Sequence, residues 1–123
     1  MLSLAPLKEK TEIEKIYKEK GFDYNEFSGC VLCKDGAEIL GLCLYELTNK
    51  KITVNYIEPQ ADLGLADGIL RSTLHVAAER SIMNAFYGGN ISEIAKKLKF
   101  VKNAEEKSLD IDKLFSSCCS CGK

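Results

Sequence analysis

Cysteine is the residue type with the most chemical potential in this chain of 123 residues, which contains six of them. Three of the six, Cys118, Cys119 and Cys121, lie close together near the C-terminus. Closely spaced thiolates bind zinc, copper(I) or iron–sulfur groups and also carry out thiol redox chemistry. Packing does not explain this clustering in a polar segment. We therefore treat these three residues as candidate ligands for zinc or another soft metal.

The other cysteines fall in a region that reads as β-structure. Cys30 and Cys33 have the C-x-x-C spacing, but residues three apart on a strand point to opposite faces. The partner of Cys43 depends on the turn at residues 35–36: a two-residue turn places Cys30 on the same face, and a three-residue turn places Cys33 there. The alternative interpretation of all three is that they are small buried hydrophobic residues.

The elements that would position such groups follow from hydrophobic periodicity. A short strand is expected at residues 2–7, and a helix beginning at Thr11, where Thr11 and Glu14 form a capping-box pattern. Gly21 is expected to end that helix in a left-handed conformation. Two strands follow in a hairpin around the Asp35-Gly36 turn, and a third strand at residues 51–58 is ended by Pro59.

The second half of the chain predicts a long helix at residues 65–81 with Asp62 as its N-cap. A short strand at residues 83–89, a short helix near residues 91–100 and a closing hairpin at residues 99–112 complete the order. We expect residues 1–112 to form one abbreviated α+β domain and residues 113–123 to form the cysteine-rich tail.

Composition limits the choice of partners and location. The net charge is −1, with acidic and basic residues spread along the chain, which argues against nucleic acid or a membrane surface as a partner. The chain has no apolar run of the roughly 20 residues that a membrane span requires, and its N-terminal residues lack a secretory pattern. We therefore expect a cytoplasmic protein whose cysteines are thiols or metal ligands.

Four segments resemble the GNAT superfamily of acyl-CoA-dependent N-acetyltransferases. Residues 33–47 resemble its second and third strands, including the glycine at Gly41, and residues 55–59 resemble the end of its fourth strand. Residues 64–82 resemble the helix after its pyrophosphate loop, and residues 87–100 its fifth strand and next helix. The resemblance covers about residues 27–112. It implies a central, mixed but mostly antiparallel sheet flanked by helices.

The resemblance also implies acetyl-CoA or another acyl-CoA as co-substrate. In the family pattern, the loop before the long helix carries an Arg or Gln, two residues, a Gly, one residue, and a Gly or Ala. Here Gly64 and Ala66 are in register, whereas Ala61 stands at the Arg or Gln position and Gln60 lies one residue early. The implied cofactor-binding residues are Ile57, Leu63, Gly64, Leu65, Ala66 and Asn90.

The same resemblance implies acid–base catalysis on an amine acceptor that is a small molecule or a peptide. Glu58, late in the fourth strand, is the candidate base, and Tyr87, at the end of the fifth, is the candidate catalytic phenol. Tyr56 is a second phenol nearby, and Ala95 stands where many members have the acidic tyrosine. Each tyrosine also fits a core role.

Two functions follow. The first is an N-acyltransferase that transfers an acetyl or other acyl group from acyl-CoA to an amine. The alternative is a catalytically inactive GNAT-fold binding or regulatory module whose cysteine tail binds metal or acts in thiol redox chemistry. Because the region before residue 27 is short, we also consider a homodimer. The acceptor is the least predictable property for the same reason.

Overall fold

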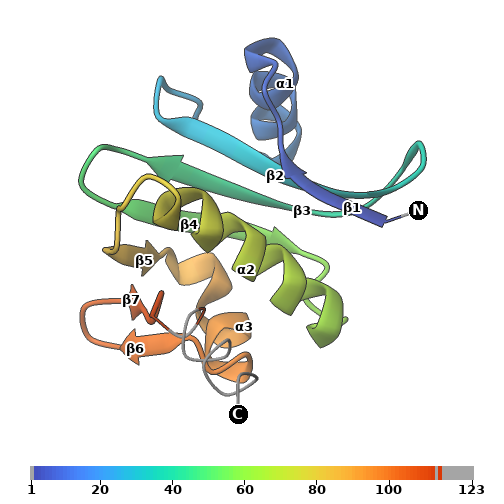
Figure 1. Cartoon of the computed structure of the whole chain (residues 1–123). Helices are drawn as coiled ribbons and strands as arrows, with labels where there is room; N and C mark the ends of the chain where they lie inside the picture. Colours follow the sequence, from blue (N-terminus) through green and yellow to red (C-terminus); the bar gives the residue numbers. More distant parts are fainter. Residues whose placement is uncertain (1, 113, 115–123) are drawn as a thin grey trace.

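The computed structural model describes residues 2–112 and 114. Within this part of the chain, three α-helices flank one seven-stranded sheet (Figure 1). The strands are β1 Leu2–Pro6, β2 Ser28–Asp35, β3 Glu38–Leu47, β4 Ile52–Glu58, β5 Ala85–Tyr87, β6 Val101–Asn103 and β7 Ser108–Leu109. The helices are α1 Lys10–Lys20, α2 Leu63–Ala78 and α3 Ser92–Lys97, with a 3₁₀ turn, η1, at Gly89–Ile91.

The sheet order is β1-β2-β3-β4-β5-β7-β6. Only the β4–β5 pairing is parallel among the strand pairs described, because α2 connects these two strands as a crossover. The expectation of a mixed, mostly antiparallel α+β sheet is confirmed. None of the helices in the described part of the chain is long and apolar enough to cross a membrane.

Two hydrophobic cores lie on opposite faces of the sheet. The larger core holds the buried faces of α2 and α3, including Ile69, Leu70 and Ile94. The smaller core lies under α1 and includes Ile13 and Tyr17. Figure 1 shows α1 and α2 on opposite sides of the β1–β4 region. Side chains that alternate along a strand therefore enter two different environments.

Helix α1 forms where expected but begins differently. The capping box predicted for Thr11 and Glu14 is wrong, because Glu9 is the N-cap and makes no side-chain capping bond. Thr11 lies inside the first turn, since the helix begins at Lys10. The predicted end is confirmed: Gly21 has a φ of 81°, and its N–H donates to the carbonyl of Lys18. Lys20 is consequently the last residue of the helix.

Helix α2 has the predicted cap and an earlier start. The Asp62 side chain accepts a hydrogen bond from the Leu65 N–H at 3.1 Å, so Asp62 is the N-cap and the helix begins at Leu63 rather than Leu65. The helix ends at Ala78, before the expected Ser81. Strand β4 ends at Glu58 and α2 begins at Leu63, so only residues 59–62 separate the two elements.

The β2–β3 hairpin settles the question of the cysteine faces. Its turn has two residues, Gly36 and Ala37, instead of the expected Asp35 and Gly36, because Asp35 still pairs with Glu38. Gly36 has a φ of 65°, and a bulge follows in β3. Cys33 pairs with Gly41 while Lys34 pairs with Ile39, which leaves Leu40 as an extra residue. Cys43 therefore shares the α2 face with Cys33, and Cys30 lies in the α1 core. Burial raises the pKa of the Cys30 and Cys43 thiols to about 12.

A second bulge lies in β4. Leu44 of β3 pairs with Tyr56 and Tyr45 pairs with Val54, so Asn55 is an extra residue in β4. Val54 and Ile57 consequently both belong to the α2 core, whereas Tyr56 packs against the α1 core. Simple alternation from Val54 would place Tyr56 on the α2 face and Ile57 on the α1 face. The extra residue reverses these positions.

Candidate functional site

The strand β4 has an open edge in its second half. Strand β5 pairs with β4 only as far as Val54, where the Gly88 N–H donates to the Val54 carbonyl at 2.8 Å. The chain then turns into η1 and α3. No other described strand pairs with this side of β4 from Asn55 to Glu58. The sheet therefore opens between β4 and β5 on the side where β4 ends.

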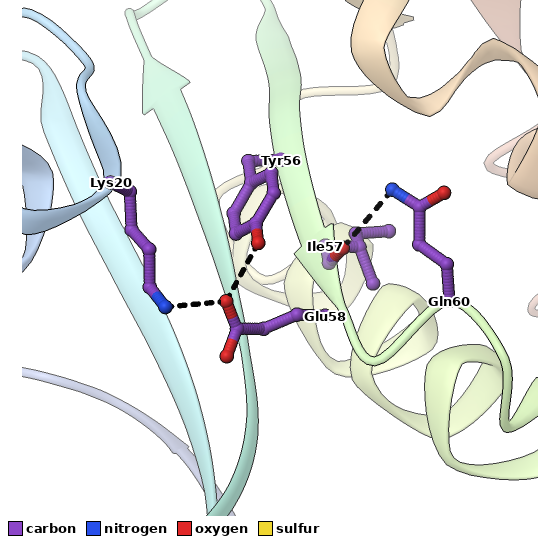
Figure 2. A network of polar contacts seen from close by, with 5 residues as sticks. All are labelled: Lys20, Tyr56, Ile57, Glu58 and Gln60. Atoms are coloured by element: carbon purple, nitrogen blue, oxygen red, sulfur yellow. Dashed lines mark hydrogen bonds and ion pairs between the residues drawn. The ribbon is translucent and has the colours of Figure 1, made fainter.

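One backbone acceptor at this opening is occupied from within the chain. The Ile57 carbonyl accepts a hydrogen bond from the side-chain amide of Gln60 at 3.3 Å (Figure 2). The Ile57 side chain is fully buried in the α2 core, so only its backbone is available to a ligand. Gln60 is exposed and lies in the loop before α2. A ligand amide could therefore replace the Gln60 amide at this carbonyl.

The N-terminus of α2 lies directly after this opening. Leu63 and Gly64 are exposed in its first turn, while the Ala66 side chain is buried in the core. Asp62 already accepts from the Leu65 N–H. Asp67, one turn further on, forms an ion pair with Arg71 at 2.8 Å, so its charge is balanced within the helix. Free N–H groups in a first helical turn attract anions.

A pocket of about 380 Å³ borders the same helical turn on its other side. Its lining combines β1 and β2 with the glycine-bearing face of α2: Ser3, Leu4, Cys33, Gly64, Leu65 and Gly68. The first turns of α2 are thus accessible both at the loop and along this face.

Three side chains from two distant parts of the chain meet at the end of β4. The Lys20 ammonium lies 2.7 Å from Glu58 Oε1, and the Tyr56 hydroxyl donates to the same oxygen at 2.7 Å (Figure 2). The Lys20 and Glu58 side chains are 29% and 33% exposed, so solvent and small solutes reach both. Glu58 points to the α1 side because of the bulge at Asn55.

The electrostatics of this network favour the ionised forms of Lys20 and Glu58. Burial acts to raise the pKa of Glu58, but the hydrogen bonds from Lys20 and Tyr56 and the charge of Lys20 outweigh it, so the pKa lies below its ordinary value. The hydrogen bond to Glu58 raises the pKa of Lys20, against partial burial. The same carboxylate raises the pKa of Tyr56. Glu58 is therefore a carboxylate at neutral pH.

The other predicted catalytic residue lies on the opposite face. Tyr87 pairs with Val54 in register and is buried in the α2 core. Glu58 and Tyr87 are thus not brought into contact, although both border the opening between β4 and β5. Asn90 is exposed within η1 and is not the N-cap of α3, which is Ile91. Ala95 is fully buried.

Sequence reasoning missed Lys20. It precedes Glu58 by 38 positions in the chain, and nothing near it in the sequence marks it as a partner of a strand residue. His75 lies on the surface of α2, 3.1 Å from Glu79, with a side chain that is 61% exposed. Cys118, Cys119 and Cys121 lie outside the described residues, and no His, Cys, Asp or Glu cluster within the described part could hold a metal ion.

Comparisons with known proteins address the fold. No protein-family model matches the sequence, and no curated protein matches it. Among solved structures, the ribosomal-protein-S18-alanine N-acetyltransferase from Escherichia coli is 14% identical, with a TM-score of 0.60 over 80% of this chain and 74% of that one. The chain has the GNAT fold.

Two further solved structures with this fold are similar to the chain at comparably low sequence identity. A GNAT-family acetyltransferase from Streptococcus pneumoniae TIGR4 is 16% identical, with a TM-score of 0.51 over 76% of this chain and 79% of its own. The ribosomal-protein-alanine N-acetyltransferase from Brucella melitensis biovar Abortus 2308 is 11% identical, with a TM-score of 0.51 over 72% of this chain and 80% of its own. At these identities the likeness establishes the GNAT fold, whereas function has to be argued from the site.

Proposed function

We propose that this protein is an acyl-CoA-dependent N-acyltransferase that transfers an acetyl or other acyl group to a primary amine. The observation that carries the proposal is the open edge of β4 beside the N-terminus of α2. An extended ligand containing amide groups can add to an open strand edge through backbone hydrogen bonds, and a pyrophosphate can bind at a helix N-terminus. Acyl-CoA combines both features in one molecule.

The residues present fit such a ligand once one side chain moves. The Ile57 carbonyl would accept from an amide of the pantetheine arm once Gln60 moves away. The N–H groups of Leu63 and Gly64 would hold the pyrophosphate, with Asn90 on the other side of the opening. Leu65 and Ala66 would only border it, because the Ala66 N–H already donates to the Asp62 carbonyl at 2.9 Å. Asp62 retains the Leu65 N–H, and the Arg71 pair offsets the charge of Asp67. When bound, the cofactor supplies the activated thioester.

The proposed catalytic role of Glu58 follows from its ionised state. The acceptor arrives as an ammonium ion and must lose a proton before its nitrogen can attack the thioester carbonyl. A carboxylate held at the end of β4 can take that proton and pass it to solvent. The carbon–sulfur bond then breaks, and the CoA thiolate takes up a proton, for which Tyr87 is the proposed donor on the other face of the opening.

Ligand-dependent thermal stability tests the proposal directly. At a concentration about 100 times the dissociation constant, a ligand stabilises the native state by about 2.7 kcal/mol, which corresponds to a rise in Tm of roughly 5–10 °C for a domain of this size. We expect acetyl-CoA and CoA both to raise the Tm of the full chain. If neither does so at millimolar concentration, the protein does not use this cofactor.

The second candidate function is an inactive GNAT-fold module that uses its cysteine tail to bind metal or in thiol redox chemistry. Two observations from the sequence favour it: the clustering of Cys118, Cys119 and Cys121, and Ala95 at the position of the usual acidic tyrosine. Metal analysis of anaerobically purified protein tests it, with the triple serine variant as control. Equal metal content in the two proteins would rule out metal binding by the tail.

Three properties remain predictions alongside the activity. They are a cytoplasmic location, the lack of nucleic-acid or membrane partners, and the option of a homodimer. None of them is needed for the proposed chemistry.

A further inference from the structure

We propose that the Lys20 ammonium group occupies the position on Glu58 that belongs to the ammonium group of the acceptor. The acceptor is an unbranched primary alkylammonium, and it displaces Lys20 from Glu58. The inference rests on the proposed function for the reaction but not for the binding site itself. Lysyl side chains of peptides and free diamines share this chemistry. The site would accept the primary amine of either compound.

The geometry of the network supports this assignment. The Lys20 Nζ lies 2.7 Å from Glu58 Oε1, at hydrogen-bonding distance for an ammonium on a carboxylate. Tyr56 donates its hydroxyl hydrogen to the same oxygen at 2.7 Å, which fixes the direction of that carboxylate. Figure 2 shows Lys20 and Tyr56 converging on Glu58 from different elements. An external ammonium would find the same preorganised acceptor.

The surroundings also fit an aliphatic stem that carries an ammonium. The Lys20 Nζ lies 6.0 Å from the centroid of the Tyr56 ring, and the rings of Phe22 and Tyr56 are 5.5 Å apart. Aromatic faces near a cation favour it electrostatically and also pack against methylene groups. The lysyl side chain is therefore an internal example of the ligand class that the site accepts.

Displacement of Lys20 is physically accessible. Lys20 is the last residue of α1, followed by the helix-ending Gly21, and its side chain and that of Glu58 are about one-third exposed. Ion pairs at this level of exposure are weak, so a competing cation replaces one at modest cost. Exchange of one ammonium for another keeps Glu58 paired. A neutral or anionic acceptor would leave the carboxylate without a counter-charge, so the site selects cations.

The transfer step balances with this acceptor. The ammonium group loses two protons in all, one through Glu58 to solvent and one that restores the Tyr87 hydroxyl after Tyr87 has protonated the CoA thiolate. A carbon–nitrogen bond forms as the carbon–sulfur bond of the thioester breaks. The products are the N-acyl amine, CoA thiol and one released proton.

A binding experiment without CoA tests the inference. The probes are 1,5-diaminopentane, an Nα-acetyl-lysine methylamide and, as a neutral control with the same five-carbon stem as the diamine, 1-pentanol. Affinities are measured by NMR titration. Removal of an internal competitor raises apparent affinity by the inverse of the free fraction of the site. We expect Lys20→Met to bind both amines about three- to tenfold more tightly than the wild type, and 1-pentanol no more tightly.

The controls separate displacement from general loosening of the fold. Lys18→Met removes another lysine of α1, one that pairs with Glu14 on the exposed face, and should bind as the wild type does. Lys20→Arg keeps a cation on Glu58 and should also bind as the wild type does. The double variant Lys20→Met/Glu58→Gln should lose the gain.

The outcomes are distinct from those of the cofactor test. If Lys20→Met binds the amines no more tightly than the wild type, or if the gain persists without Glu58, the inference is wrong. A gain with the lysine derivative alone, or with the diamine alone, supports the inference and identifies the source of the amine. A gain in a protein that does not bind CoA leaves the amine site in place and removes only the acyltransferase proposal.

Discussion

Glu58 is the residue at which the chemistry of this molecule is concentrated. It ends β4, takes its direction from the bulge at Asn55, and receives an ammonium and a hydroxyl on a single oxygen. Its lowered pKa and the raised pKa of Lys20 describe the same interaction from its two ends. An interaction of this kind contributes to folding only over the pH range in which both partners are charged in the native state.

The first prediction concerns that pH range. Because the folded pKa of Glu58 lies below its ordinary 4.5, the stabilisation is present above that value and is lost as the pH falls through the lowered pKa. Because the pKa of Lys20 is raised above its ordinary 10.5, the stabilisation is present below 10.5 and is lost above the raised value. We expect the Tm difference between the wild type and Glu58→Gln to be constant from about pH 5 to pH 10.

Thermal denaturation across pH measures this difference. It should shrink towards zero in acid, below about pH 4. A difference that persists unchanged at pH 2 would show that Glu58→Gln acts through packing and not through loss of the ion pair.

The second prediction concerns Gln60. Its side-chain amide blocks the Ile57 carbonyl, which the proposed cofactor requires. A net hydrogen bond is worth about 0.5–1.5 kcal/mol, so Gln60→Ala should tighten CoA binding roughly two- to tenfold in calorimetric titration. Asn84→Ala removes a comparable 3.3 Å bond from a side-chain amide to the Lys50 carbonyl and should leave CoA binding unchanged. Weaker CoA binding by Gln60→Ala would mean that Gln60 contacts the cofactor itself.

At the scale of elements, the end of β4 is held in place by a close approach to β3. A Cβ on Gly41 would lie 2.6 Å from the Glu58 carbonyl oxygen, 2.7 Å from Ile69 Cδ1 and 2.9 Å from Pro59 Cδ. Only glycine lets β3, β4 and α2 meet at this distance. The position of Glu58 therefore depends on a residue that has no functional group.

The third prediction follows from this contact. Gly41→Ala should destabilise the protein by about 1–3 kcal/mol in chemical denaturation, because its methyl group overlaps the Glu58 carbonyl oxygen and the side chains of Ile69 and Pro59. Gly68→Ala is the matched control: its Cβ would meet Leu4 Cδ1 at an ordinary 3.6 Å inside α2. That substitution should be neutral or stabilise by up to about 1 kcal/mol. Equal effects of the two variants would contradict the role of Gly41.

The fourth prediction concerns the attachment of α1. The Tyr17 hydroxyl approaches the carbonyls of Gly29 at 2.9 Å and Tyr45 at 2.6 Å, and burial holds its pKa far above the ordinary range. We expect Tyr17→Phe to cost about 0.5–1.5 kcal/mol of unfolding free energy, since it removes a buried donor. Tyr24→Phe, in a partly exposed ring that packs edge-on against Tyr17, should cost much less. Urea denaturation distinguishes the two.

The order of the elements could be predicted because each element carries a local signal. Asp62 caps α2, Gly21 ends α1, and Gly36 allows the hairpin turn, which lies one residue later than expected, at Gly36 and Ala37. The capping box at Thr11 failed because Glu9, two residues earlier, is the N-cap and the helix begins at Lys10. The bulges at Leu40 and Asn55 depend on pairing between strands, and the contact of Lys20 with Glu58 depends on tertiary packing. No local pattern encodes either.

At the scale of the whole molecule, the sheet protects its own thiols. Cys30, Cys33 and Cys43 are all buried within β2 and β3, whose pairing is the longest among the described strands. A buried thiol with a raised pKa carries almost no thiolate, which is the reactive form. Modification of these residues therefore requires the sheet to open.

The fifth prediction uses that protection. With a pKa of about 12 at Cys30 and Cys43 against an ordinary 9.0, the thiolate fraction at pH 8 falls about a thousandfold. We expect iodoacetamide to leave these two cysteines unmodified in the native protein and to modify them in urea, as measured by peptide mass spectrometry. Rapid labelling of Cys30 without denaturant would contradict the buried position of β2.

The bulge at Asn55 means that β4 can lose one codon without losing the site. Asn55 is the extra residue of the strand, so its deletion would leave Val54 opposite Tyr45 and Tyr56 opposite Leu44. Strand residues alternate between faces, so Tyr56 and Glu58 would still point towards α1 and Ile57 towards α2. A chain of the same fold that lacks the bulge would therefore present the same acid beside α1, and it would align with this sequence only across a gap at Asn55.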